Sequence, residues 1–272
     1  MKPSIFMLCL TVMVFLSSCK TDPKNKNVAS DTIQATSQKN DSPSKAQERD
    51  KADSLITETV AAHGGALYDK AHYKFGFRDK HYTFQNKNGG FIYTVTGQKD
   101  GNEIRDVLEK GILTRTVNGD TAELSPKDVV KYTEALNSVV YFATLPHKLQ
   151  DAAVNSSYDG RTTIKGQDYD VITVTFDPEG GGNDHQDEFR YWINADTKTM
   201  DYLAYNYETD GGGVRFRSAY NPRNVGGIRF QDYVNYEAPI GTPLKELPEL
   251  YESGDLKELS RIETEEVVEL GE

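Results

Sequence analysis

The strongest constraint on the fold is an alternation of hydrophobic and polar residues that begins near residue 72. In "HYKFGFRD", Tyr73, Phe75 and Phe77 alternate with polar neighbours, and similar short runs follow to about residue 238. Glycine-containing turn signals separate these runs, for example at Asn88-Gly89-Gly90 and Lys99-Asp100-Gly101. Side chains on a strand point alternately to two faces, and Asx-Gly or Gly-Gly turns close hairpins. The pattern therefore predicts an antiparallel meander.

The number of runs limits how this meander can be arranged. About ten or eleven strands are too many for one flat sheet, because a sheet of that width curls. We therefore expect a mainly β (α+β) fold, a strongly curved antiparallel sheet or half-open β-barrel of about 10–11 strands. Helices would cover its concave face.

A first helix precedes the strands. Ser42 can cap it and Pro43 suits its first turn. Gly64-Gly65 ends it in a left-handed conformation, which makes His63 a C-terminal helix residue stabilised by the helix dipole. One apolar stripe at helical spacing faces the core; it consists of Ala52, Leu55, Ile56, Thr59 and Val60.

A second helix interrupts the meander. Ser125 and Asp128 offer a capping box with Pro126 in the first turn, and Leu145-Pro146 ends the helix. We expect it to act as a lid over the concave face, although an ordinary core helix would show the same pattern. The two interpretations differ only in whether a cavity remains beneath it. The expected lid residues are Val129, Tyr132, Leu136, Val139 and Val140.

The N-terminus predicts the location of the protein. Ile5 to Leu16 is an apolar run too short to span a membrane but suited to a signal peptide. It ends in Leu16-Ser17-Ser18-Cys19, which resembles the lipobox of bacterial lipoproteins. We therefore expect residues 1–18 to be a signal peptide and Cys19 to carry a membrane-anchoring lipid. Residues 19–41 would form a disordered tether and 42–272 a single domain with a peripheral C-terminal part, 241–272.

Charge and cysteine content exclude several classes. The formal net charge is −11 and there is no block of lysines or arginines, so we expect no nucleic-acid partner. Of the two cysteines, Cys9 leaves with the signal peptide, and the remaining one can form neither a disulfide nor a cysteine metal site. No nucleophile elbow, phosphate-binding glycine loop or dinucleotide fingerprint is present.

The stretch "NDHQDEFRYWI", residues 183–193, has the appearance of a site. In an extended chain His185, Asp187 and Tyr191 share the face that Phe189 and Ile193 would bury, and Trp192 points the other way. His185 and Asp187 could begin a metal site or a proton-transfer pair. Zinc needs three or four ligands, however, and no second half is apparent. We favour a solvated strand start, with a ligand or partner contact at the cavity rim as the alternative, and predict no metal, cofactor or catalytic residue.

Arginines cluster between residues 211 and 230, a stretch without acids. Arg215 and Arg217 would share one strand face and Arg229 would lie on the neighbouring strand. Such a patch could receive lipid phosphates or an acidic partner. Cross-strand pairing is the commoner use of such residues; the available acids are Glu188, Asp201 and Glu208.

Short motifs along residues 50–238 resemble an uncharacterised lipoprotein family of Bacteroidetes, DUF6503. They are His63-Gly64-Gly65, Leu145-Pro146-His147-Lys148-Leu149, Tyr191-Trp192-Ile193, Met200-Asp201-Tyr202-Leu203-Ala204-Tyr205, Arg215-Phe216-Arg217 and Ile228-Arg229-Phe230-Gln231-Asp232-Tyr233. The expected architecture is similar to that of the lipoprotein carriers LolA and LolB, which bind acyl chains in an apolar cavity and catalyse nothing.

This resemblance implies a non-catalytic, lipid-anchored envelope lipoprotein, in the outer membrane, that binds a lipid, acyl chain or other apolar small molecule in a concave cavity. The alternative is a periplasmic or surface module that binds an envelope protein and whose cavity is filled by its helices. A metal-dependent enzyme using His185 and Asp187 ranks third.

Overall fold

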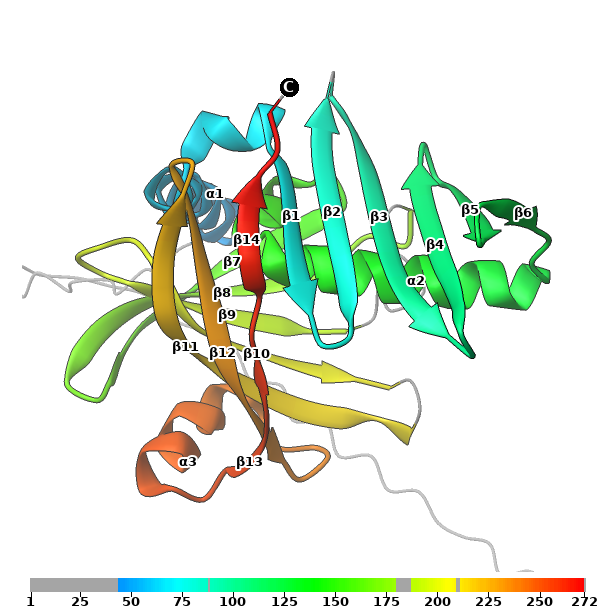
Figure 1. Cartoon of the computed structure of the whole chain (residues 1–272). Coiled ribbons are helices and arrows are strands. Elements are labelled where there is room, and N and C mark those ends of the chain that lie inside the picture. Colours follow the sequence, from blue (N-terminus) through cyan, green and yellow to red (C-terminus); the bar gives the residue numbers. More distant parts are fainter. Residues whose placement is uncertain (1–43, 88, 180–186, 209–210, 272) are drawn as a thin grey trace, which may run out of the picture. The chain divides into compact units, whose positions relative to one another are not determined.

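The computed structural model describes residues 44–87, 89–179, 187–208 and 211–271, which belong to one compact unit. The expected signal peptide, Cys19, the tether, Ser42, Pro43 and His185 lie outside the described residues. Two antiparallel sheets of seven strands make up most of the unit (Figure 1).

The strands of the first sheet, sheet A, follow the order β14-β1-β2-β3-β4-β5-β6. Their bounds are β1 His72–Phe77, β2 Lys80–Lys87, β3 Gly90–Lys99, β4 Asn102–Glu109, β5 Ile112–Val117, β6 Asp120–Ala122 and β14 Glu265–Glu269. Sheet B has the order β13-β12-β11-β10-β9-β8-β7. Its strands are β7 Val154–Ile164, β8 Gln167–Phe176, β9 Phe189–Asn194, β10 Met200–Tyr207, β11 Gly213–Val225, β12 Ile228–Ala238 and β13 Lys257–Ile262.

The expected mainly β, antiparallel and open architecture is confirmed, and neither sheet closes into a barrel. The described residues hold fourteen strands, more than the ten or eleven expected. The C-terminal segment 241–272 supplies two of them, because β13 forms one edge of sheet B and β14 one edge of sheet A. Sequential strands pair with each other from β1 to β6 and from β7 to β13, as in a meander.

Helix α1 (Lys45–His63) packs against β7 and β12. It begins later than expected, because Ser44 rather than Ser42 is the N-cap. The Ser44 hydroxyl accepts from the backbone N–H of Gln47 at 3.3 Å, and the Gln47 side chain accepts from the Ser44 N–H at 2.8 Å. This reciprocal capping box satisfies two N–H groups at the helix start. The predicted apolar stripe is confirmed, since all five of its residues are buried.

Helix α2 (Pro126–Ala143) begins as expected, with the Ser125 hydroxyl accepting from the Asp128 N–H. It packs against β3 and β5, and it crosses the strands of sheet A (Figure 1). The short helices η1 (Gly65–Lys70) and η2 (His147–Gln150) follow α1 and α2. The pair η4 (Leu244–Glu246) and α3 (Leu247–Ser253) lies between β12 and β13. No helix in the described part of the chain is long and apolar enough to cross a membrane.

Sheet B is covered on both faces. Its inner face contributes Phe189, Tyr191 and Ile193 to the main core, which also contains side chains of α1, α2 and sheet A. Its outer face contributes Trp192 to a second core covered by η4 and α3. The alternation predicted for residues 189–193 is therefore confirmed.

His63 ends α1 inside the main core and is 1% exposed. Its Nε2 accepts a hydrogen bond from the backbone N–H of Met200 at 3.1 Å. Burial, followed by the positive charge of Arg229, lowers the pKa of His63 to about 3. His63 lies in the last turn of α1, as predicted. Its predicted stabilisation by the helix dipole is wrong, because burial disfavours the charged ring that the dipole would stabilise.

Candidate functional site

Helix α2 leaves much of its apolar face incompletely buried. Six side chains of α1 are buried, but only Leu136 and Val140 are buried on α2, a helix of nearly the same length. The other lid residues, Val129, Tyr132 and Val139, pack against the core only half buried. The helix therefore covers an apolar surface without sealing it.

Beneath the C-terminal half of α2 lies a group of aromatic side chains that we call the aromatic cluster. The Phe189 ring lies 5.5 Å from Phe176 and 5.3 Å from Tyr205, measured between centroids. From α2, the Phe142 ring approaches Tyr205 to 5.5 Å and the Tyr141 ring approaches Phe189 to 6.0 Å. The members are Tyr141, Phe142, Phe176, Phe189, Tyr191 and Tyr205. Such edge and offset contacts form a continuous apolar surface with polar hydroxyls at intervals.

Tyr191, a predicted site residue, links this cluster to α2. It is fully buried, and its hydroxyl lies 2.6 Å from that of Tyr141. Burial raises the pKa of both phenols, so both stay protonated and can donate and accept. The Tyr141–Tyr191 pair is a polar attachment of the helix to sheet B.

An arginine stacks on an aromatic ring near each end of α2. The guanidinium carbon of Arg115 lies 3.7 Å from the Tyr132 ring centroid, and that of Arg217 lies 3.8 Å from the Phe142 centroid. Arg115 also donates twice to the Asp106 carboxylate, each time at 2.6 Å. The positive charge of Arg115, which stacks on Tyr132, is therefore balanced by the Asp106 carboxylate.

Arg217 has no such carboxylate. It is 7% exposed, and its Nη2 donates to the Tyr205 hydroxyl at 2.9 Å. Its Nε and Nη1 have no hydrogen-bond partner, and none of the ion pairs within the described residues includes it. Asn235, directly opposite on β12, is also buried, and its Oδ1 likewise has no partner. Buried polar groups are normally satisfied. Among the described residues the other such atoms are Nδ1 of His63 and of His147, so Arg217 is the charged side chain among them.

The structure separates the three arginines proposed as a patch. Arg215 lies beside Arg217 on the same face and donates to the Tyr207 hydroxyl at 2.6 Å, with Glu237 opposite it on β12. Arg229 is six residues from Asn235 along β12, roughly 20 Å in an extended strand. Its Nε donates to Gln231 at 3.2 Å. Only Arg215 and Arg217 are brought together.

Cross-strand pairing with the three expected acids does not account for these arginines, and the acid directly opposite Arg215 is Glu237 instead. Within the described residues, Glu188, Asp201 and Glu208 form no ion pair with Arg215, Arg217 or Arg229. Asp201 instead accepts hydrogen bonds from polar side chains of sheet B, and Glu188 lines the opposite face of that sheet. Sequence spacing alone could not show this, because the faces are set by strand register.

Asp187, the described member of the His185–Asp187 pair, lies just before β9 and is 8% exposed. No group of three or more His, Cys, Asp or Glu side chains among the described residues is placed to hold a metal ion.

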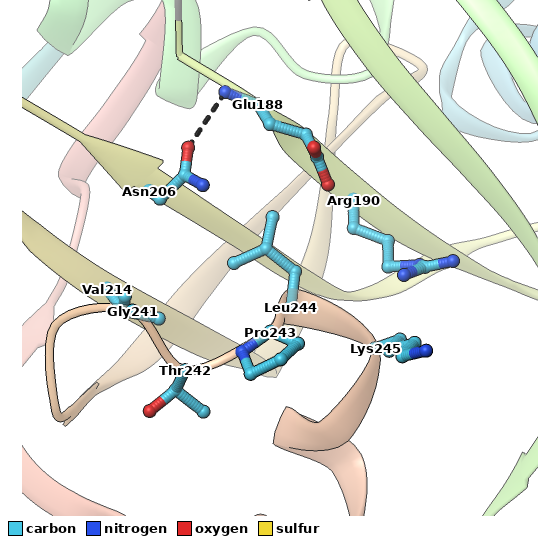
Figure 2. A pocket seen from close by; sticks show the side chains of 9 residues that line it. All are labelled: Glu188, Arg190, Asn206, Val214, Gly241, Thr242, Pro243, Leu244 and Lys245. Atoms are coloured by element: carbon cyan, nitrogen blue, oxygen red, sulfur yellow. Dashed lines mark hydrogen bonds between the residues drawn. The ribbon is translucent and has the colours of Figure 1, made fainter. Parts of the chain in front are cut away.

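Two pockets lie away from α2. One of about 280 Å³ opens on the outer face of sheet B, between β9–β11 and residues 241–245 (Figure 2). Glu188, Arg190 and Lys245 give it mixed charge, and Arg190 is paired with Asp159. The other, about 720 Å³, is lined by residues 151–153 and 177–179. Neither of these two pockets is lined by a residue of α2.

The geometry defines an open α+β protein whose two antiparallel sheets enclose helices on their inner side. The chain belongs to the family of unknown function DUF6503, whose profile matches residues 2–264. No curated protein matches it.

Several solved structures are similar to this fold. A DUF1329 family protein from Desulfovibrio piger is 10% identical, covers 80% of this chain and 92% of its own, and gives a TM-score of 0.39. A putative outer membrane lipoprotein-sorting protein domain from Vibrio parahaemolyticus is 8% identical, with coverages of 75% and 98% and a TM-score of 0.40. A LolA superfamily protein from Nitrosomonas europaea is 12% identical, with coverages of 70% and 87% and a TM-score of 0.39.

Proposed function

We propose that this protein is a non-catalytic, lipid-anchored envelope protein that binds an acyl chain or another apolar ligand between α2 and the inner face of sheet B. The observation that carries the proposal is the aromatic cluster, covered by a helix whose own apolar face stays half exposed. Ligand sites are typically apolar surfaces with a few placed polar groups, and the hydroxyls of Tyr191 and Tyr205 supply such groups here.

Displacement of α2 would open the site. The contacts to be broken at its C-terminal half are the Tyr141–Tyr191 hydrogen bond and the stack of Phe142 on Arg217. Each such contact contributes about 1 kcal/mol. A bound acyl chain would replace the lost apolar contacts at about 25 cal/mol per Å² of surface removed from water. The acyl chain would have to cover the surface that Leu136, Val140 and the two aromatic side chains of α2 cover in this structure.

The membrane anchor is part of the same proposal. Lipid on Cys19 would hold the domain at a membrane, which we propose to be the outer membrane. A flexible segment of the length of residues 19–41 spans roughly 25 Å on average. The domain would then stay close to a supply of acyl chains.

The test uses the mature chain with Cys19→Ser, so that it stays soluble. After delipidation, displacement of a fluorescent fatty acid should reveal one saturable site, and Tyr205→Ala should weaken binding, because Tyr205 belongs to the part of the aromatic cluster on sheet B. Tyr251→Ala is the matched control, because Tyr251 is a half-buried aromatic residue of the second core. Absence of saturable binding, or equal loss in both variants, would contradict the proposal.

The alternative is a protein-interaction module with a filled interior. It is favoured by the burial of Leu136, Val140 and Tyr191, through which α2 packs onto the main core. Hydrogen exchange separates the two functions, since a displaceable α2 should exchange well before α1, whereas a permanently packed α2 should be as protected as α1. Addition of a fatty acid should change exchange in α2 only if the ligand binds there.

A further inference from the structure

We propose that Arg217 receives the phosphate of a monoacyl phospholipid whose acyl chain lies against the aromatic cluster. This inference rests on the proposed function and names the class of its ligand. It starts from the charge of Arg217, which is buried in the main core and forms no ion pair with an acid of the described residues.

Five arginines of the two sheets contact a carboxylate; the pairs are Arg115–Asp106, Arg161–Asp170, Arg190–Asp159, Arg223–Asp232 and Arg261–Glu258. Among the described residues, Arg217 is the one arginine that is buried, and it is not among these five. Arg215 faces Glu237 across the strand pair. Arg217 makes one hydrogen bond, to Tyr205, and two of its nitrogens have no partner. A guanidinium in that position is suited to an anion that is not part of the chain.

The neighbour of Arg217 narrows the chemistry of this anion. Arg217 needs hydrogen-bond acceptors, whereas the unpartnered Oδ1 of Asn235 needs a donor. A fatty-acid carboxylate supplies only acceptors. A glycerophosphate head supplies both, because its phosphate oxygens accept from the guanidinium and its glycerol hydroxyl donates to the amide oxygen. Arginine also matches phosphate geometry well.

The position of Phe142 joins the head site to the chain site. Its ring lies over the Arg217 guanidinium and also contacts Phe189 and Tyr205 in the aromatic cluster. A movement of α2 that lifts Phe142 therefore uncovers the charge and the apolar surface together. One molecule with an anionic head and a single chain would contact both.

The experiment compares ligands that share a chain but differ in the head. Delipidated mature chain with Cys19→Ser is titrated with palmitoyl lysophosphatidylglycerol, monopalmitoylglycerol, palmitate and inorganic phosphate. We expect the lysophospholipid to bind roughly tenfold or more tightly than the neutral monoacylglycerol, as a charge-assisted contact provides. Arg217→Gln should remove this preference and leave monoacylglycerol binding within about twofold. Arg215→Gln is the matched control, because Arg215 lies two residues from Arg217 on the same face of β11. It should change the preference for the lysophospholipid by less than about threefold.

The outcomes separate the two proposals. If none of the acylated ligands binds, the proposed function fails. If both palmitoyl glycerides bind equally, or if palmitate binds as tightly as the lysophospholipid, the apolar site stands but the phosphate site does not. Phosphate that binds alone as tightly as the lysophospholipid would indicate a free-phosphate site and overturn the inference. If Arg217→Gln does not fold, the preference of the wild type for the lysophospholipid over the monoacylglycerol still decides the question. Arg217→Lys, which keeps the charge, then serves as the variant and should show a smaller preference than the wild type.

Discussion

Lowering the pH from 7.5 to 5.0 should destabilise the protein through His63. The folded state holds this side chain neutral, with a pKa of about 3 against 6.5 for an exposed histidine. The unfolded chain therefore binds a proton as the pH falls through 6.5, while the folded chain does not until about pH 3. Stability that is fully present above pH 6.5 is thus lost progressively between pH 6.5 and 3. At pH 5.0 the loss is about 1.5 pH units times 1.36 kcal/mol, or about 2 kcal/mol.

Urea denaturation at the two pH values measures this loss. His63→Gln is the reference variant, because its amide oxygen can still accept from the Met200 N–H but does not titrate. Burial also lowers the pKa of His147, whose contribution has the same sign but occurs in both proteins and cancels in the comparison. The wild type should lose about 2 kcal/mol more than the variant. Equal losses would show that His63 is not held neutral and would refute the reasoning.

Two further substitutions test the fold. Asp106→Asn should lower the free energy of unfolding by about 3 kcal/mol, because it breaks the ion pair between the buried Asp106 and the half-buried Arg115; a urea midpoint close to that of the wild type would show that the pair adds little. Gly64→Ala should destabilise by more than about 1 kcal/mol, since φ at Gly64 is +139° and an added Cβ would lie 3.0 Å from Ile228. An unchanged thermal midpoint in that variant would mean that the end of α1 adapts to a side chain.

Alternation and turn chemistry were sufficient to predict the antiparallel meander and the faces of β9. They did not predict β13 and β14 as separate strands, because most of their residues are exposed and show no apolar period. Pairing with β12 and β1 gives these segments their strand structure, and tertiary context of this kind is not visible in a local pattern.

The candidate site could be predicted only in part. The helix face of α2 followed from its spacing. Arg217 was predicted only as one of a patch with Arg215 and Arg229, because residues 211–230 contain no acid. Its isolation in the structure could not be derived, since it depends on which acids the strand register places on the inner face. The part played by Phe142 was missed as well. The sequence signal that could have indicated it is that Phe142 is an aromatic residue in the last turn of the expected lid helix.

The chain crosses between the two sheets in two places. Residues 263–264 connect β13 to β14, and the segment that contains α2 connects β6 to β7. The first connection is two residues long and joins β13, an edge strand of sheet B, to β14, an edge strand of sheet A. The second joins the strands at the far edges, β6 and β7, through residues 123–125 and 144–153. No strand pair depends on α2, so a displacement of the helix would leave both sheets intact. Since Leu145 and Leu149 of the second connection are buried, such a displacement would have to bend the chain mainly at residues 123–125.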